Sequence, residues 1–258
     1  MTTSPPDSDQ NQDGSGSLAT SADLAFRTNA SRSIARIVEP RTLPARTLED
    51  RRMIHQDGSR RVQADAFREI RTRLLGLGGA ANFVTLVASV SHGSGGSFVA
   101  RNLAAAFAFD EAKTALLIDC DVRNPTQHAA LGVNPANGGM IDYLEHPSLG
   151  VEKILYHTGI PRLRLMPAGR QREMSAEYFS SFRMRAVLDS LRSRYSDRYL
   201  FLDGPAVNSS PDTRILADLV DLIVLVVGYG RDTPQAVTKA IANFDPAKLA
   251  GVVFNHAP

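Results

Sequence analysis

The sequence is poor in cysteine and in long apolar runs. Cys120 is the single cysteine in 258 residues, which excludes a disulfide framework within the chain and suits a reducing compartment. The longest apolar stretches, residues 83–90 and 219–227, are far shorter than the roughly 20 residues that a membrane-spanning helix needs. The first 22 residues are polar and lack the apolar core of a signal peptide. We therefore expect any attachment to a membrane to come from a partner or from surface charge.

Lysine is also scarce, although basic residues as a group are not. Only four of the 29 lysine and arginine residues are lysines, and the net charge is +2, so the composition does not favour a nucleic-acid partner. Residues 32–73 hold eleven arginines against six acidic residues. This segment is either a solvated arm that lies on the domain or a surface for anionic lipid or an acidic partner.

A glycine-rich phosphate loop is present, but its lysine is missing. An apolar strand pattern at 83–91 leads into the turn HGSGGS at 92–97, and a helical pattern follows. Strand, glycine-rich turn and helix form the context that a phosphate loop requires. Gly96 stands where the lysine belongs. The backbone amides that cradle phosphates need only glycine and a helix N-terminus, so we expect a nucleotide site with weakened chemistry.

Strand and helix patterns alternate along the rest of the chain. Continuous apolar strands between helices predict an α/β fold of the P-loop NTPase type, with a doubly wound, mainly parallel sheet and helices on both faces. We expect a disordered, arginine-rich N-terminal arm at 1–62 and the α/β domain at 63–258. The expected strands are 83–91, 114–119, 162–167, 198–203, 221–227 and 251–254. The expected helices are 65–75, 97–109, 141–144, 151–157, 175–195, 211–219 and 233–244.

Three aspartates directly follow or end predicted strands. Asp119 and Asp121 end the run LLIDCD, and Asp203 ends the run RYLFLD. Ligands of an open α/β sheet bind outside the carboxyl ends of the strands, so these carboxylates should lie near the phosphate loop. Mg²⁺ prefers oxygen ligands, and the aspartates could hold it together with Ser97. Any one of them alone could instead cap a turn or a helix.

Several segments together resemble one family. The run LLIDCDVRNP at 116–125 is similar to the second acidic motif of the bacterial tyrosine kinases, which are P-loop proteins of exopolysaccharide and capsule export. The run DAFREIR at 65–71 is similar to the family's oligomerisation motif Glu-x-x-Arg-x-x-Arg, with aspartate in place of glutamate. The resemblance covers about residues 62–256 and continues in the segments GMIDYL (139–144), LMPAG (165–169), DGP (203–205) and GVVFN (251–255).

The resemblance implies a site for ATP or ADP with Mg²⁺. The residues that it assigns to the nucleotide are Gly93, Ser94, Gly95, Gly96, Ser97, Phe98 and Asn255, the last of them near the adenine. The residues that it assigns to the metal and its water shell are Ser97, Asp119, Asp121 and Asp203. Asp119 would also be the base for a tyrosine hydroxyl. Asp65, Arg68 and Arg71 would lie at an interface between subunits.

The sequence departs from the family pattern in three places. Gly96 replaces the loop lysine, Gly204 and Ala206 replace residues of the family's Asp-Ser/Thr-Pro-Pro motif, and the family's tyrosine-rich tail is absent. Losing one well-placed cationic donor costs on the order of 3 kcal/mol, or about 10²-fold in rate. The four lysines are poorly placed to replace it. Of the arginines, Arg123 is the better candidate for a catalytic cation, ahead of Arg101.

The resemblance and the departures together predict a regulatory protein. We expect a nucleotide-binding, kinase-like component of exopolysaccharide or capsule export with weak or no kinase activity. It would form homo-oligomers and lie in the cytoplasm, peripheral at the inner membrane through a polysaccharide co-polymerase. Three alternatives stay open: an active protein-tyrosine autokinase with a non-standard phosphate loop, a structural subunit without nucleotide, and a positioning ATPase of the septum-site and partition type.

Overall fold

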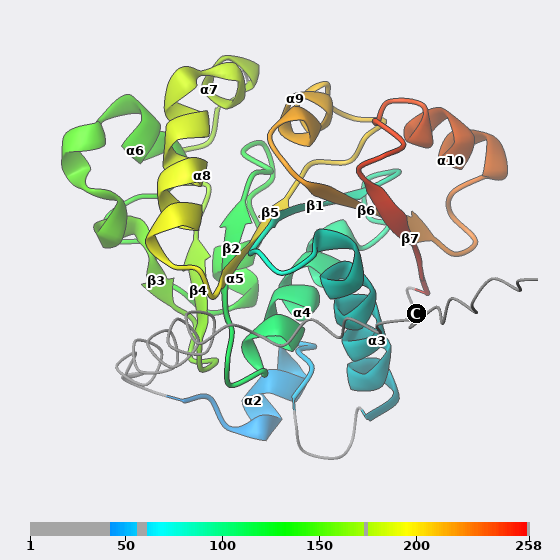
Figure 1. Cartoon of the computed structure of the whole chain (residues 1–258), viewed down its shortest axis with the longest axis horizontal. Helices are drawn as coiled ribbons and strands as arrows, with labels where there is room; N and C mark the ends of the chain where they lie inside the picture. The colour runs from blue at the N-terminus through cyan, green and yellow to red at the C-terminus, as the bar shows by residue number, and fades with distance from the viewer. Residues whose placement is uncertain (1–41, 56–60, 173–174, 257–258) are drawn as a thin grey trace, which may run out of the picture.

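The computed structural model describes residues 42–55, 61–172 and 175–256 (Figure 1). Its centre is a seven-stranded sheet in the order β3-β4-β2-β5-β1-β6-β7. Neighbouring strands run parallel except β3, which is antiparallel to β4. The predicted α/β class with a mainly parallel sheet is therefore confirmed. The strands are β1 (Val84–Ser89), β2 (Thr114–Asp119), β3 (Tyr156–His157), β4 (Leu163–Met166), β5 (Arg198–Asp203), β6 (Leu222–Gly228) and β7 (Leu249–Asn255).

The central strands are buried on both faces. Every residue of β1, β2, β5 and β6 is buried, which explains why these strands are continuous apolar runs without polar alternation. The predicted bounds of β2 and β5 are confirmed. Strand β7 begins at Leu249, earlier than expected, and it forms one edge of the sheet.

Helices cover both faces, as a doubly wound fold requires. One face packs on α2 (Ala45–Asp50), α3 (Arg61–Gly78) and α4 (Gly96–Ala108). The other packs on α6 (Met140–Glu145), α7 (Ala176–Ser180), α8 (Phe182–Arg194), α9 (Asp212–Asp218) and α10 (Pro234–Ile241). Three short elements complete the described part of the chain: α5 (Gln127–Ala130) and the 3₁₀ turns η1 (Pro147–Leu149) and η2 (Val151–Ile154). Figure 1 shows α3 and α4 lying together on one side of the sheet.

Part of the expected N-terminal arm belongs to the folded unit. Leu48, Met53 and Ile54 are buried in the core beside α3 and α4. The backbone amide of Ile54 donates to the side-chain oxygen of Asn102 at 2.7 Å, and Asn102 is itself buried in α4. Residues 42–55 therefore pack on the domain. Residues 61 and 62 of the expected arm belong to α3, and residues 1–41 and 56–60 lie outside the described residues.

Two expected helices differ from the structure. The helix expected at 175–195 is divided into α7 and α8 at Ser181, which is extended (φ −68°, ψ 150°) and accepts a hydrogen bond from the Met184 amide. Ser181 thereby caps a new helix. The helix expected at 151–157 is the turn η2 followed by β3, which pairs with β4. Apolar periodicity over so few residues does not separate a helix from a strand.

Helix α3 is longer than the expected 65–75. It runs through Gly76 to Gly78, because packing against α4 and the sheet overrides the poor helix propensity of glycine. Gly78 is also required by its neighbour, since a Cβ there would lie 2.1 Å from the ring of Phe83. Across the described ranges, no helix combines the length and apolar character that crossing a membrane requires.

Phe107 should be one of the main stabilising residues of the core. It is fully buried in α4, and its ring centroid lies 4.9 Å from those of both Tyr199 and Phe201. We expect Phe107→Ala to lower the free energy of unfolding by about 3–5 kcal/mol, because it leaves a cavity against the sheet. Urea unfolding measures this. Phe182→Ala is the control, since Phe182 is 83% exposed and should change stability by less than about 0.5 kcal/mol. Equal losses in the two variants would contradict the packing described.

Candidate nucleotide and metal site

The phosphate loop joins β1 to α4 and depends on glycines with positive φ. Gly93 (φ +80°) and Gly95 (φ +92°) lie in the left-handed region that glycine tolerates best. A Cβ on Gly95 would lie 2.1 Å from Nδ2 of Asn255. This amide donates to the carbonyl oxygen of Ser94 at 3.2 Å. The fold thus brings Asn255, at the end of β7, onto the loop.

Gly96, where the lysine would stand, is packed against the end of β1. A Cβ at this position would lie 3.1 Å from the backbone nitrogen of Ser89 and 3.2 Å from its Oγ. A side chain at position 96 therefore requires Ser89 to shift by a few tenths of an ångström. Phe98, two residues further on, packs its ring edge-to-face on Phe67 of α3, with centroids 6.1 Å apart.

Gln127 links Ser97 to Asp203 inside the protein. Its Nε2 donates to Oδ2 of Asp203 at 2.6 Å and to the carbonyl oxygen of Ser97 at 2.9 Å. The Ser97 side chain also forms a hydrogen bond with Asp203. Gln127 and Asp203 are both fully buried. Sequence reasoning missed Gln127, because a glutamine in a short helix after a turn belongs to no motif.

Asp119 lies directly opposite Asp203 in the parallel pairing of β2 with β5. Its Oδ2 accepts from the backbone amides of Thr126 at 3.1 Å and Gln127 at 3.0 Å, and its Oδ1 accepts from the amide of Asp121 at 3.2 Å. Asp119 therefore holds the chain between β2 and α5 in place. Asp121 is only partly buried and accepts from the amide of Asn124 at 3.1 Å.

Burial governs the protonation of these carboxyl groups. It raises the pKa of Asp119 well above its usual range, and the neighbouring Asp203 raises it further. Burial also raises the pKa of Asp203 to about 7, although hydrogen bonds from Gln127 and Ser97 oppose the rise. The pKa of Asp121 is raised by its partial burial. Because the charge of Asp203 raises the pKa of Asp119, the two carboxyl groups titrate as a pair.

The residues fit a hydrated Mg²⁺ rather than a metal enclosed by protein ligands. Oδ1 of Asp203 is buried without a hydrogen-bond partner, and the Ser97 hydroxyl lies beside the same carboxylate. Mg²⁺ keeps several waters and takes one or two protein oxygens together with phosphate oxygens. Within the part of the chain that the structure describes, no three histidine, cysteine, aspartate or glutamate side chains converge to hold a metal. Ser97 and Asp203 are the residues that fit the ion.

The arginines near the site occupy different places. Arg123 is exposed, and its carbonyl oxygen accepts from Gln171 at 3.5 Å. Arg101 lies one turn after Ser97, with its guanidinium 5.4 Å from the centre of the Phe98 ring. Burial lowers the pKa of Arg101, while the charge of Asp203 raises it. Arg231, which the sequence did not single out, donates from Nη1 to the carbonyl oxygen of His92 at 2.9 Å.

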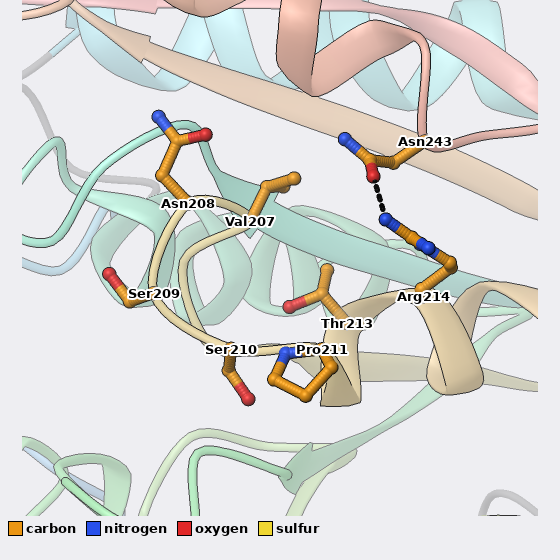
Figure 2. Close-up of a pocket in the computed structure, with 8 residues that line it drawn as sticks. All are labelled: Val207, Asn208, Ser209, Ser210, Pro211, Thr213, Arg214 and Asn243. Carbon is orange, nitrogen blue, oxygen red and sulfur yellow. Dashed lines mark hydrogen bonds between the residues drawn. The ribbon is translucent and has the colours of Figure 1, made fainter.

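A polar cavity of about 300 Å³ is lined by the loop after β5, the first turn of α9 and Asn243 (Figure 2). The loop after β5 forms its wall and is joined to the end of β1, where the Val207 amide donates to the Ser89 oxygen at 2.9 Å. Gly204, one of the departures from the family motif, lies close to β1, since a Cβ there would come within 2.8 Å of Leu86. Arg214 and Asn243, which line the cavity, bind each other.

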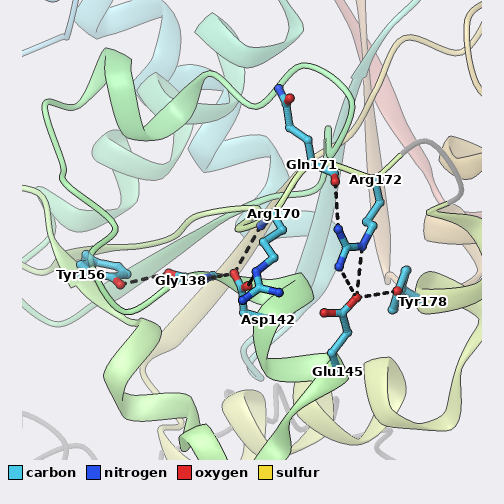
Figure 3. Close-up of polar contacts among 9 residues, drawn as sticks. Gly138, Asp142, Glu145, Tyr156, Arg170, Gln171, Arg172 and Tyr178 are labelled. Carbon is cyan, nitrogen blue, oxygen red and sulfur yellow. Dashed lines mark hydrogen bonds and ion pairs between the residues drawn. The ribbon is translucent and has the colours of Figure 1, made fainter.

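Two of the family-like segments, GMIDYL and LMPAG, are joined to each other. The Met140 amide donates to the Pro167 oxygen at 2.8 Å, which holds α6 against the end of β4. Nearby, Oε1 of Glu145 accepts from the Tyr178 hydroxyl and from Nη2 of Arg172, each at 2.7 Å (Figure 3). These segments therefore pack α6 against the carboxyl end of β4.

The three residues of the expected interface lie on α3. Nη1 of Arg68 is 2.6 Å from Oδ1 of Asp65, and the two side chains are 42% and 57% exposed. Arg71 points inward, because its Nη1 donates to the carbonyl oxygen of Ala106 in the last turn of α4 at 2.9 Å. In the single chain, Arg71 therefore stabilises its own domain.

The parallel sheet, the phosphate loop and the aspartates beside it define a P-loop α/β protein. No family model matches the chain. It is 31% identical over 204 residues to EpsB of Ralstonia solanacearum, provisionally named a tyrosine-protein kinase, a match that covers 76% of this chain and 26% of EpsB. It is 30% identical over 172 residues to the tyrosine-protein kinase YwqD of Bacillus subtilis, covering 66% of this chain and 70% of YwqD.

The chain belongs to the bacterial tyrosine-kinase family, as the match to YwqD establishes. The fold agrees, since the crystal structure of the chimerical protein CapA2B2 superposes with a TM-score of 0.72. That superposition covers 90% of this chain and 99% of the chimera at 24% identity. The resemblance drawn from the sequence motifs is thus confirmed. The chain spans only about a quarter of the length of EpsB, and family membership disfavours the positioning ATPase.

The raised pKa of Asp203 predicts how stability depends on pH in metal-free protein. The folded state keeps a proton up to about pH 7, whereas the unfolded chain releases it near pH 4. The contribution of Asp203 to the free energy of unfolding is therefore full below about pH 4 and is lost as the pH rises to about 7. Asp203→Asn, which cannot ionise, should raise the melting temperature relative to wild type more at pH 8 than at pH 5.

Thermal unfolding in EDTA at the two pH values measures this difference. Asp189→Asn, at an exposed position on α8, is the control and should shift the melting temperature equally at both. A shift for Asp203→Asn that is the same at pH 5 and pH 8 would contradict the raised pKa.

Proposed function

We propose that this protein is a nucleotide-binding, kinase-like regulator of exopolysaccharide or capsule export, with little phosphoryl-transfer activity. The observation that carries the proposal is a phosphate loop kept in its folded form, with Ser97 and Asp203 beside it, although Gly96 replaces the lysine. The backbone amides of a glycine-rich loop bind phosphates without any side chain. Losing the lysine should therefore slow phosphoryl transfer more than it weakens phosphate binding, because the transfer depends on positioned charge.

In this proposal each residue of the site has a separate role. The loop from Gly93 to Ser97 binds the phosphates of ATP or ADP, and Asn255 lies toward the base. Ser97 and Asp203 hold Mg²⁺, which neutralises phosphate charge when bound, and Asp121 faces its water shell. Asp119 is the candidate base, because burial raises its pKa and strengthens it as a proton acceptor once it is ionised.

Phosphoryl transfer should be slow for two reasons. The missing cationic donor costs about 10²-fold or more in rate. In addition, both oxygens of Asp119 accept hydrogen bonds from backbone amides, so a tyrosine hydroxyl would compete with them. An active autokinase with a non-standard loop and a structural subunit without nucleotide are the two remaining alternatives. Measurements of nucleotide binding and of autophosphorylation distinguish these alternatives from the proposed function.

We also propose where the protein acts. A polysaccharide co-polymerase would bring it to the inner membrane, and copies of the chain would associate through α3. The similarity of residues 65–71 to the family's oligomerisation motif supports this, as do the exposed Asp65 and Arg68. A neighbouring subunit could exchange partners with their ion pair, because an exposed pair of this kind is worth at most about 1 kcal/mol.

Nucleotide binding is the first test. Titration calorimetry with Mg-ADP should show binding with Kd on the order of 0.1–1 mM. Gly95→Ala should abolish it, because its Cβ would collide with Asn255 and φ is +92°. Gly79→Ala is the matched control: Gly79 also has a positive φ (+72°), but a Cβ there meets nothing within 4 Å. Correctly folded wild-type protein that shows no heat at millimolar Mg-ADP would favour the structural subunit.

Catalysis is tested separately with ATP. We expect negligible tyrosine phosphorylation of the wild-type protein, while Gly96→Lys should tighten Mg-ATP binding by about tenfold or more. Strong autophosphorylation of the unaltered protein, abolished by Asp119→Asn, would establish the autokinase instead.

Assembly is tested at Arg68. Arg68→Ala should weaken self-association and co-sedimentation with membranes that contain the co-polymerase about fivefold, or ~1 kcal/mol. Arg185→Ala, at an exposed position on α8, is the control. Arg71 is avoided because it also bonds within its own domain. Unchanged sedimentation velocity and membrane recovery for Arg68→Ala would exclude α3 as the interface.

A further inference from the structure

The segment between β6 and α10 lies on the phosphate loop. The guanidinium of Arg231 contacts the loop at two adjacent residues: Nη1 is 2.9 Å from the carbonyl oxygen of His92, and a Cβ built on Gly93 would lie 2.4 Å from the same nitrogen. Gly93 therefore leaves the space that the arginine occupies. The segment is itself compact, because the backbone amide of Arg231 donates to the Gly228 oxygen at 3.1 Å.

Asp232, the next residue, holds the loop from inside. Its Oδ2 accepts from the Ser94 hydroxyl and from the Gly228 amide, each at 2.7 Å, and Ser94 is fully buried. Partial burial acts to raise the pKa of Asp232, but hydrogen bonds from Ser91, Gly228 and Ser94 outweigh it and leave the pKa below its usual value. Asp232 is thus an anion that ties two serines of the loop to the end of β6.

We propose that Arg231 supplies the positive charge that Gly96 no longer provides, by contacting the phosphates of the nucleotide held in the loop. This rests on the nucleotide binding proposed above. A guanidinium carries five N–H donors and stays charged at any physiological pH, and the bond to His92 uses one of those donors. Planar guanidinium groups bind phosphate oxygens in pairs, so the residue suits a phosphate ligand.

The other candidate cations are placed less well for this role. Arg101 lies over Phe98, and Asp203 is the charge that raises its pKa, so it compensates a buried carboxylate on the metal side. Arg123 lies on the turn after β2, where its charge acts on the carboxyl group of Asp121. For Arg231, by contrast, the structure places the guanidinium on the loop itself.

The test compares phosphate-dependent binding in matched variants by calorimetry with Mg-ADP and with adenosine. Arg231→Ala should weaken Mg-ADP binding about tenfold or more and leave adenosine binding unchanged, because adenosine has no phosphate. Arg231→Lys keeps the charge but not the paired contact, so its affinity for Mg-ADP should lie between those of Arg231→Ala and wild type. Arg194→Ala removes the same charge from an exposed ion pair with Glu152, and it should bind like wild type.

A rescue variant separates a direct charge effect from a structural one. Adding Gly96→Lys to Arg231→Ala should restore Mg-ADP affinity, since the lysine returns a cation to the loop. Equal Mg-ADP affinity in wild type and Arg231→Ala overturns the assignment of Arg231 alone. Parallel losses for adenosine and Mg-ADP overturn it as well, because they indicate a disturbed loop. No binding by folded wild-type protein overturns both this assignment and the proposed nucleotide binding.

Discussion

The pairing of β5 with its two neighbours determines the geometry of the site. β5 is bonded to β1 on one side and to β2 on the other, which puts Asp203 opposite Val87 and Asp119. Because the three strands are parallel, their carboxyl ends share one edge of the sheet, and the phosphate loop starts from that edge. Sliding β5 by one residue would turn Asp203 toward the opposite face and separate it from Ser97.

Two buried carboxyl groups at one edge are costly, and the surrounding residues reduce the cost. A buried charge without a partner is strongly unfavourable. Asp119 is satisfied by three backbone amides, whereas Asp203 accepts from Gln127 on Oδ2 and interacts with the Ser97 side chain. The remaining oxygen of Asp203 has no partner. This arrangement lowers the stability of the ligand-free protein but leaves an oxygen free to bind a ligand. Functional sites commonly make this compromise between stability and binding.

The phosphate loop keeps its form without lysine because it is held at several points. Asn255 binds the Ser94 carbonyl oxygen, Asp232 binds the Ser94 hydroxyl, and Arg231 binds the His92 carbonyl oxygen. These contacts come from the ends of β6 and β7, so the neighbouring strands replace part of the order that a bound phosphate would impose. A loop ordered in advance loses less conformational entropy on binding, which partly offsets the missing charge.

The local sequence pattern was enough to predict the class of fold, the bounds of β2 and β5, the phosphate loop and the aspartates. Buried parallel strands are continuous apolar runs, and tight turns need glycine, so both features can be read from neighbouring residues. Only the tertiary structure decided which side chains complete the site. Gln127 reaches Asp203 across 76 positions, and Arg231 reaches His92 across 139. The hydrogen bond from Ile54 to Asn102 and the helix break at Ser181 could not be predicted from the sequence for the same reason. Each depends on the register and the layers of the whole fold, which no short segment encodes.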